Sequence, residues 1–92
     1  MAHTSKLAAE YTNTFKLDVE YTDTFGGEAN YSWVKRETLE LPALKLSDRA
    51  IMRRAKAAMG LSGVRGRSYS YGDMWEFRPY RSHTVMFATV QN

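Results

Sequence analysis

The sequence predicts an α+β domain: an antiparallel sheet of about four to five strands with one main helix packed on one face. Two observations predict this class. Five short segments show apolar alternation or strand-favouring composition, which is typical of partly buried strands. A segment near the middle carries the apolar spacing of an amphipathic helix. The order is therefore ββαβββ, and strands grouped around one helix favour an antiparallel sheet.

The length and composition indicate one domain, over residues 1–92, with a loose N-terminus at 1–10. The chain has no cysteine, which excludes disulfides, thiolate metal sites and thiol nucleophiles. Its first residues contain no long apolar run, so we expect neither a signal peptide nor a membrane span.

The first two strands are expected to form a hairpin. Alternating apolar residues mark the first strand: Phe15, Leu17, Val19 and Tyr21. The glycine pair Gly26-Gly27 permits the chain to reverse, and we place a longer loop over residues 23–30. The second strand carries Tyr31, Trp33, Leu39 and Leu41 and ends at Pro42, which has no N–H to donate.

The helix is predicted to begin after Ser47 and to end at Gly60. Ser47 is suited to cap free amides, and Asp48 suits the positive end of the helix dipole. An apolar stripe faces the core, formed by Ile51, Ala55, Ala58 and Met59. Gly60 favours a left-handed helix end, with Leu61 and Val64 packing back beneath the helix.

Three further strands follow the helix. We expect them at residues 65–71, 74–78 and 84–90, with a tight turn at 71–73 and a second turn at 80–82. The last is the strongest strand in the sequence because it is rich in β-branched and aromatic residues. We expect Trp33 and Trp75 to be core residues, because so small a domain has few other large side chains.

The sequence carries no pattern typical of an enzyme. Its two histidines, His3 and His83, lie in the terminus and in a turn, and no hydrolase, nucleotide-binding or zinc spacing occurs. The glycines of residues 60–66 follow a helix and precede a strand, the reverse of a nucleotide-binding loop, so a helix cap and loop explain them. We therefore expect no catalysis, no cofactor, no metal and no small-molecule substrate.

Charge divides the chain into two halves. Residues 1–46 hold five Lys and Arg against seven Asp and Glu, whereas residues 47–92 hold eight against three. The eight cations of the second half are the predicted binding residues: Arg49, Arg53, Arg54, Lys56, Arg65, Arg67, Arg78 and Arg81. We expect them to gather into one outward-facing patch. A solvated helix face with core aromatics is the alternative interpretation.

Aromatic residues stand between these cations, at Tyr69, Tyr71, Trp75 and Tyr80. Arginine with interleaved aromatics suits a flexible nucleic acid, because the cation meets phosphate and the ring stacks on a base. The same arginines also suit an acidic protein surface. In the first half, Asp18, Glu20, Asp23 and Glu28 either approach a basic groove of a partner or form a solvated strand face.

Three runs carry a resemblance to a known class of protein. Residues 21–33, 53–65 and 71–73 resemble small proteins encoded by phages and prophages, among them anti-CRISPR proteins that block the type I-F surveillance complex. The resemblance implies an inhibitor that binds this multi-subunit complex of protein and guide RNA in the host bacterial cytoplasm and stops it pairing with target DNA. The alternative is a small DNA- or RNA-binding regulatory protein of phage origin.

Overall fold

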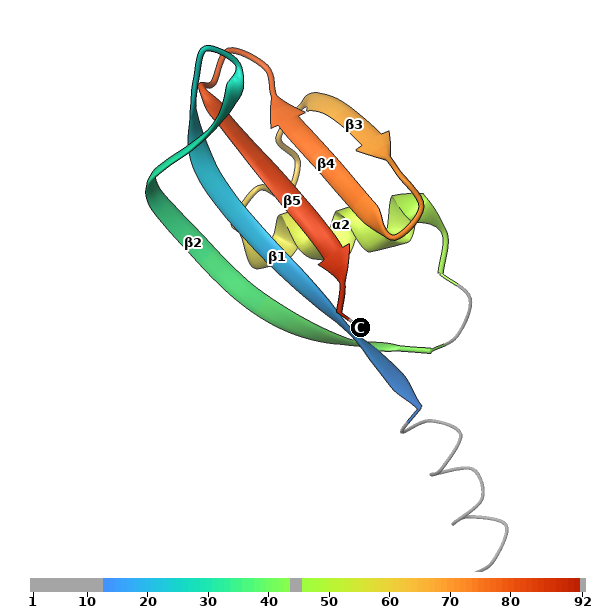
Figure 1. Ribbon diagram of the computed structural model, residues 1–92. Helices are drawn as coiled ribbons and strands as arrows, with labels where there is room; N and C mark the ends of the chain where they lie inside the picture. Colours follow the sequence, from blue (N-terminus) through green and yellow to red (C-terminus); the bar gives the residue numbers. More distant parts are fainter. Residues whose placement is uncertain (1–12, 44–45, 92) are drawn as a thin grey trace, which may run out of the picture.

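The computed structural model describes residues 13–43 and 46–91, so the predicted loose terminus at 1–10 lies outside the described residues. It confirms the predicted class and order, a five-stranded antiparallel sheet with one helix. The elements are β1 (Thr14–Phe25), β2 (Glu28–Pro42), α2 (Asp48–Ala58), β3 (Gly66–Ser70), β4 (Met74–Pro79) and β5 (Thr84–Val90). The strand order is β2-β1-β5-β4-β3, and the helix lies behind the sheet in Figure 1.

Strand β5 joins the two halves of the sheet. It pairs antiparallel with β1 on one side and with β4 on the other, so the hairpin and the C-terminal strands belong to one sheet. Its residues Val85, Met86 and Ala88 are each 0% exposed. The strand predicted most strongly from composition is thus the centre of the sheet. Among the described residues, no helix has both the length and the apolar character needed to cross a membrane.

The core lies between α2 and one face of the sheet. Leu17 and Val19 of β1, and Phe77 of β4, belong to one buried cluster with helix residues Ile51 and Ala55. The predicted apolar stripe of the helix is therefore confirmed, and Met52 joins it. The opposite face of the sheet, which we call the open face, carries no helix among the described elements.

Both predicted ends of the helix are confirmed. The Ala50 amide donates a hydrogen bond to the Ser47 hydroxyl oxygen at 3.1 Å, which satisfies one of the free donors of the first turn. Gly60 follows the helix with a φ of 74°, the left-handed conformation that glycine adopts without strain. Leu61 is buried and Val64 packs partly buried against the same core. The loop after the helix is thereby held against the sheet.

The predicted loop at 23–30 is wrong. Strands β1 and β2 continue to Phe25 and Glu28, so only Gly26 and Gly27 form the turn. Both glycines have positive φ, 63° and 85°, which is the geometry of a two-residue hairpin turn that follows the twist of the strands. The paired glycines suffice to reverse the chain, and the residues around them remain in the ladder.

The two tryptophans differ, and the prediction that Trp33 is a core residue is wrong. Trp75 is 5% exposed and its indole N–H donates to Asp48 Oδ1 at 3.0 Å, which joins β4 to the start of the helix. Trp33 is 44% exposed because β2 is an outer strand of the sheet. Its ring contacts Tyr21 edge-on, with the centroids 5.3 Å apart.

We predict that Trp75→Ala lowers the free energy of unfolding by about 3–5 kcal/mol, because it empties a buried site. Trp33→Ala is the matched control. It removes one exposed edge-on contact and is expected to cost about 1 kcal/mol. Urea denaturation of both variants measures the difference, and equal losses would contradict the placement of the two rings.

Candidate binding surface beside strand β3

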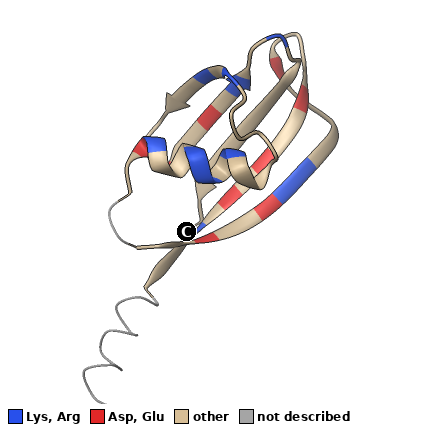
Figure 2. Ribbon diagram, turned by 180° about the vertical axis from the view of Figure 1, so that it is seen from behind, with Lys and Arg blue, Asp and Glu red and all other residues tan. Residues whose placement is uncertain are grey.

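The eight predicted cations form two groups rather than the single patch expected from the sequence. Arg49, Arg53, Arg54 and Lys56 lie on α2, and the strand group lies at and beside the paired ends of β3 and β4. That strand group comprises Arg65, Arg67, Arg78 and Arg81. Figure 2 shows blue segments along the helix and a second set at the far end of β3 and β4. The separation arises because α2 covers one face of the sheet, whereas Arg67 and Arg78 belong to the other face.

A groove of about 690 Å³ runs between α2 and β3. Buried Met52 and Trp75 contribute to its lining, and Arg49 and Arg53 stand on its helix side. Ser68 and Ser70 supply the side formed by β3. The remaining lining residues are Asp48, Lys56, Ser62, Gly63 and Tyr69. We call this the α2–β3 groove.

The arginines of the groove are available for a partner. Within residues 13–43 and 46–91, no carboxylate pairs with Arg49 or Arg53, and both are exposed. The one carboxylate that lines the groove, Asp48, already accepts the indole N–H of Trp75. Arg54 is exposed as well but does not line the groove. The groove therefore combines an apolar floor with an excess of positive charge.

Lys56 differs from its neighbours because its ammonium group is used within the fold. Lys56 Nζ donates to the carbonyl oxygen of Val64 at 2.7 Å and lies 4.2 Å from the ring centroid of Phe77. These contacts hold the loop after the helix against β4, and a cation over an aromatic face is itself stabilising. Lys56 thus has a structural role that its sequence position does not show.

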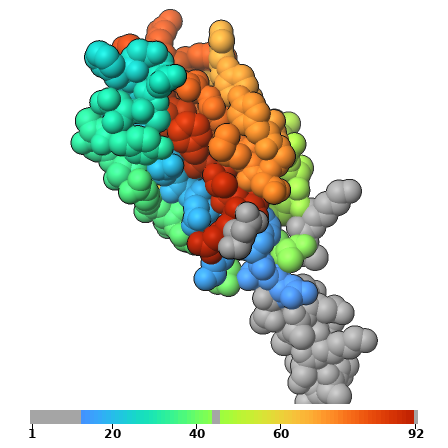
Figure 3. Space-filling view, viewed as in Figure 1, coloured from blue at the N-terminus to red at the C-terminus, as the bar shows by residue number. Residues whose placement is uncertain are grey.

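Arg78 is also engaged by the fold. Its guanidinium pairs with Glu76 and donates from Nη1 to the carbonyl oxygen of Gly27 at 2.7 Å. This contact joins the tip of the β1–β2 hairpin to β4, across 51 residues of sequence. The tip, in teal, lies at the same end of the molecule as the β4–β5 turn in Figure 3. Arg78 therefore holds the tip of the hairpin against β4.

On the open face, β3 and the residue that follows it present a row of one cation and two aromatic rings. Arg67 is the register partner of Arg78, whereas Trp75 and Phe77 of β4 are buried on the helix side. Because side chains alternate along a strand, Arg67 and Tyr69 lie on the open face. We call Arg67, Tyr69 and Tyr71 the β3 strip.

The β3 strip is partly pre-ordered. The rings of Tyr69 and Tyr71 stack with their centroids 6.2 Å apart and their planes inclined by 10°. The hydroxyls of Tyr69 and Tyr80 beside the Arg67 guanidinium raise the pKa of this group. Tyr71 is 55% exposed and Tyr80 57%. Tyr69 is partly exposed, and such parallel rings beside a cation form a surface on which a nucleobase can stack while the cation meets phosphate.

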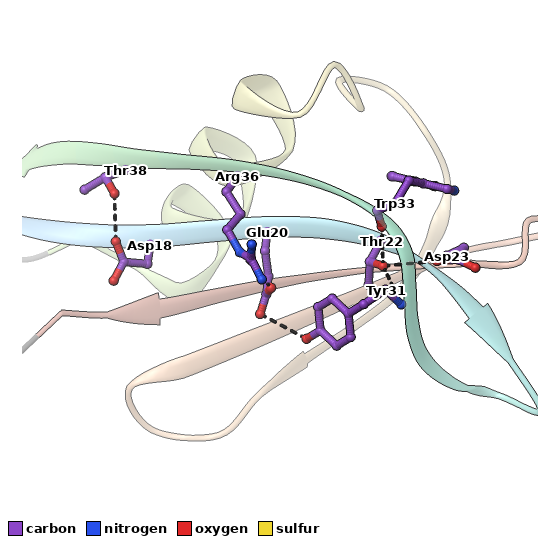
Figure 4. Close-up of polar contacts among 8 residues, drawn as sticks. All are labelled: Asp18, Glu20, Thr22, Asp23, Tyr31, Trp33, Arg36 and Thr38. Atoms are coloured by element: carbon purple, nitrogen blue, oxygen red, sulfur yellow. Dashed lines mark hydrogen bonds and ion pairs between the residues drawn. The ribbon is translucent and has the colours of Figure 1, made fainter.

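The strand-face interpretation of the acidic residues is supported by their contacts within the hairpin (Figure 4). Asp18 accepts from the Thr38 hydroxyl at 2.8 Å. Glu20 lies 3.5 Å from Arg36 and accepts from the Tyr31 hydroxyl. These carboxylates already have neighbours on β2.

Asp23 organises the irregular part of the hairpin. Its carboxylate accepts from the Ser32 hydroxyl at 2.6 Å, from the Asn30 side chain at 2.9 Å and from the Ser32 amide at 3.0 Å. These bonds, with the Ser32 hydroxyl first, lower the pKa of Asp23 well below its usual range. Next to it, buried Thr22 donates to the carbonyl oxygen of Trp33 at 2.7 Å. The register between β1 and β2 shifts between Thr22 and Thr24, and Tyr31 adopts a φ of 56°.

The two histidines do not belong to any site described above. His83 is exposed in the turn before β5, while His3 lies outside the described residues. In the part of the chain that the structure describes, no cluster of three or more His, Asp or Glu side chains could hold a metal ion. Comparison with models of protein families, with curated proteins and with solved structures gives no match.

Sequence reasoning did not place Met52, Ser68 and Ser70 at a site. For the two serines, the sequence does hold one indication of where they lie. Ser68 and Ser70 alternate with Arg67 and Tyr69 along β3, so their side chains face the other side of the sheet. Only the packing of α2 beside β3 makes that side a groove.

We predict that Lys56→Met lowers the free energy of unfolding by about 1–2 kcal/mol, because it removes a hydrogen bond and a cation–π contact while keeping the alkyl stem. Arg53→Met on the same helix is the control and is expected to change it by under about 0.5 kcal/mol. Urea denaturation compares the two. A loss for Arg53→Met as large as that for Lys56→Met would contradict the internal role of Lys56.

We predict that the hairpin loosens in acid through Asp23. Because folding lowers the pKa of this carboxyl, its contribution is fully present above the ordinary value of 3.8 and is lost as pH falls below it toward the lowered folded value. The Ser32 amide resonance, followed during acid titration, reports the change. In Asp23→Asn this amide should show no such titration, and an unchanged profile in that variant would assign the effect to another group.

Proposed function

We propose that this protein is a phage anti-CRISPR inhibitor. It binds the guide-RNA-loaded type I-F surveillance complex in the host bacterial cytoplasm and blocks pairing of the guide with target DNA, through contacts to both RNA and protein. It acts as a stoichiometric binder, without catalysis or a cofactor. The proposal rests on the resemblance of residues 21–33, 53–65 and 71–73 to such proteins and on the chemistry of the β3 strip.

The β3 strip is the observation that carries the RNA part of the proposal. A guide presented for hybridisation is single-stranded, and single strands are bound by stacking their bases on aromatic rings. Each such stack contributes about 1–3 kcal/mol. Tyr69 and Tyr71 offer parallel rings beside Arg67, whose guanidinium has no carboxylate partner among the described residues. Covering guide bases in this way would prevent target pairing by occlusion.

The second candidate is a regulator that binds free nucleic acid, and the β3 strip favours it by the same chemistry. The two functions differ in what they require. A regulator binds free RNA or DNA, and its affinity falls steeply with added salt through counterion release. An inhibitor of the surveillance complex binds the assembled complex far more tightly than the free guide.

We predict that the wild-type chain raises plasmid transformation of cells with an active type I-F system, and that it binds the purified complex. Tyr69→Ala with Tyr71→Ala should weaken that binding about tenfold or more, because two stacking surfaces are lost. The variants are expected to keep a folded chain because Tyr71 is exposed, Tyr69 is partly exposed and neither belongs to the buried core. Circular dichroism and urea denaturation check this.

Charge reversal gives a matched comparison. Arg67→Glu should weaken binding to the complex, whereas Lys16→Glu, an equally drastic change at an exposed residue of β1, should leave it unchanged. No rise in transformation with wild-type protein would reject the inhibitor, and tight salt-sensitive binding of free RNA in that case would favour the regulator. Equal effects of the two reversals would show that the β3 strip is not the interface.

A further inference from the structure

Strand β3 has one unpaired edge. It is the last strand of the sheet, with β4 as its only neighbour in the order β2-β1-β5-β4-β3. The Tyr71 amide donates to the Met74 carbonyl at 2.7 Å, and the Tyr80 amide donates to the Arg65 carbonyl at 3.0 Å. In an antiparallel pair the bonded residues alternate, so the odd residues of β3 bond to β4. The amides and carbonyls of Ser68 and Ser70 therefore project from the free edge.

The free edge and the α2–β3 groove adjoin each other. Ser68 and Ser70, whose backbone groups point outward, also line the groove. A strand added along this edge would place every second side chain over Met52 and Trp75, beside Arg49 and Arg53. Figure 2 shows the helix beside this margin of the sheet. Backbone pairing and side-chain recognition thus fall on one surface.

We propose that β3 and the α2–β3 groove bind an extended acidic segment of a partner protein, which adds to the sheet as a sixth strand. Main-chain hydrogen bonds to Ser68 and Ser70 provide the pairing, and alternate side chains enter the groove. Arg49 and Arg53 select carboxylates, since the single carboxylate lining the groove is engaged by Trp75. This inference concerns a different ligand from that of the β3 strip and a surface that shares only Tyr69 with it, and it stands whether or not the chain is an inhibitor.

The edge itself favours polypeptide over nucleic acid in the groove. Ser68 and Ser70 offer both N–H donors and carbonyl acceptors, and an added peptide strand satisfies both. The phosphate groups of a nucleic acid accept from N–H groups but have nothing to donate to the carbonyls, and the only backbone donors are the 2′-hydroxyls of RNA.

A second copy of this chain fits less well. Pairing β3 with β3 about a two-fold axis would bring the Arg49 and Arg53 pair of one copy toward that of the other, and like charges repel. The opposite outer strand, β2, is a poorer docking edge. It carries Lys35, Arg36 and Glu37 in succession, and charges of this kind discourage edge pairing.

The test uses the full chain, labelled with ¹⁵N, and a short peptide that alternates valine and glutamate. A peptide that alternates valine and lysine is the control. We expect the acidic peptide to shift the amide resonances of Ser68 and Ser70 and to slow their hydrogen exchange. Arg49→Glu with Arg53→Glu should raise the Kd about tenfold, since two attractions become repulsions. Arg54→Glu, the same change outside the groove, should leave it unaltered.

Ser68→Pro gives an independent check, because proline removes the outward-pointing N–H and leaves the bonds from β3 to β4 intact. It should abolish peptide binding; if it disturbs the fold, the arginine variants still decide the question. Equal affinity for the acidic and basic peptides, or shifts confined to other residues, would overturn the proposal. So would a single-stranded oligouridine that displaces the peptide from Ser68 and Ser70, or self-association through β3 in sedimentation experiments.

Discussion

A single short helix has to cover one face of a five-stranded sheet, and the rest of the structure depends on that mismatch of widths. Five strands about 4.8 Å apart place the outer backbones roughly 19 Å from each other. A helix with its side chains is about 10 Å across. Helix α2 packs over the central strand β5 and its neighbour β4, and Phe77 and Met86 are buried there. Both margins are consequently less covered. At β2 the result is the exposed Trp33, and at β3 it is the α2–β3 groove.

The same arrangement separates the charges of the chain in space. Carboxylates of the N-terminal half are matched within the β1–β2 hairpin, where Asp18, Glu20 and Asp23 all accept hydrogen bonds from neighbouring residues. Arginines of the C-terminal half stand at the other margin, and of those on α2 or β3 none pairs with a carboxylate in the described part of the chain. A carboxylate with a neutralising or donating neighbour projects a weaker field than a free one. Arginines without a carboxylate partner in the described part of the chain are therefore grouped on α2 and β3, although the net charge is only +3.

Local patterns were enough to predict the elements, because alternation, capping and turn residues act over a few positions. Ser47, Gly60 and the β5 strand were placed correctly for this reason. What local patterns do not contain is strand order. Trp33 alternates like a core residue, and only the outer place of β2 in the sheet exposes it. The prediction that all eight cations form one patch is not met for the same reason, because it too depends on contacts that local patterns do not contain. Arg78 donates to the carbonyl oxygen of Gly27 at the hairpin tip, which is far away in the sequence. Lys56 donates to the carbonyl oxygen of Val64, in the loop that folds back beneath the helix.

Strand β3 contributes to two surfaces, because its alternate side chains lie on opposite faces of the sheet. Arg67 and Tyr69 belong to the open face, and Ser68 and Ser70 to the groove beside α2. Gly66 shows how tightly the strand is held between them. A Cβ at this residue would overlap the carbonyl oxygen of Arg78, so glycine is what allows the start of β3 to lie this close to β4. An edge strand with a stacking surface on one side and a groove on the other is suited to a target in which RNA and polypeptide lie next to each other. That geometry connects the two proposed ligands to one kind of partner, a ribonucleoprotein, without requiring either ligand to bind alone with high affinity, because two modest contacts on one rigid body reinforce each other.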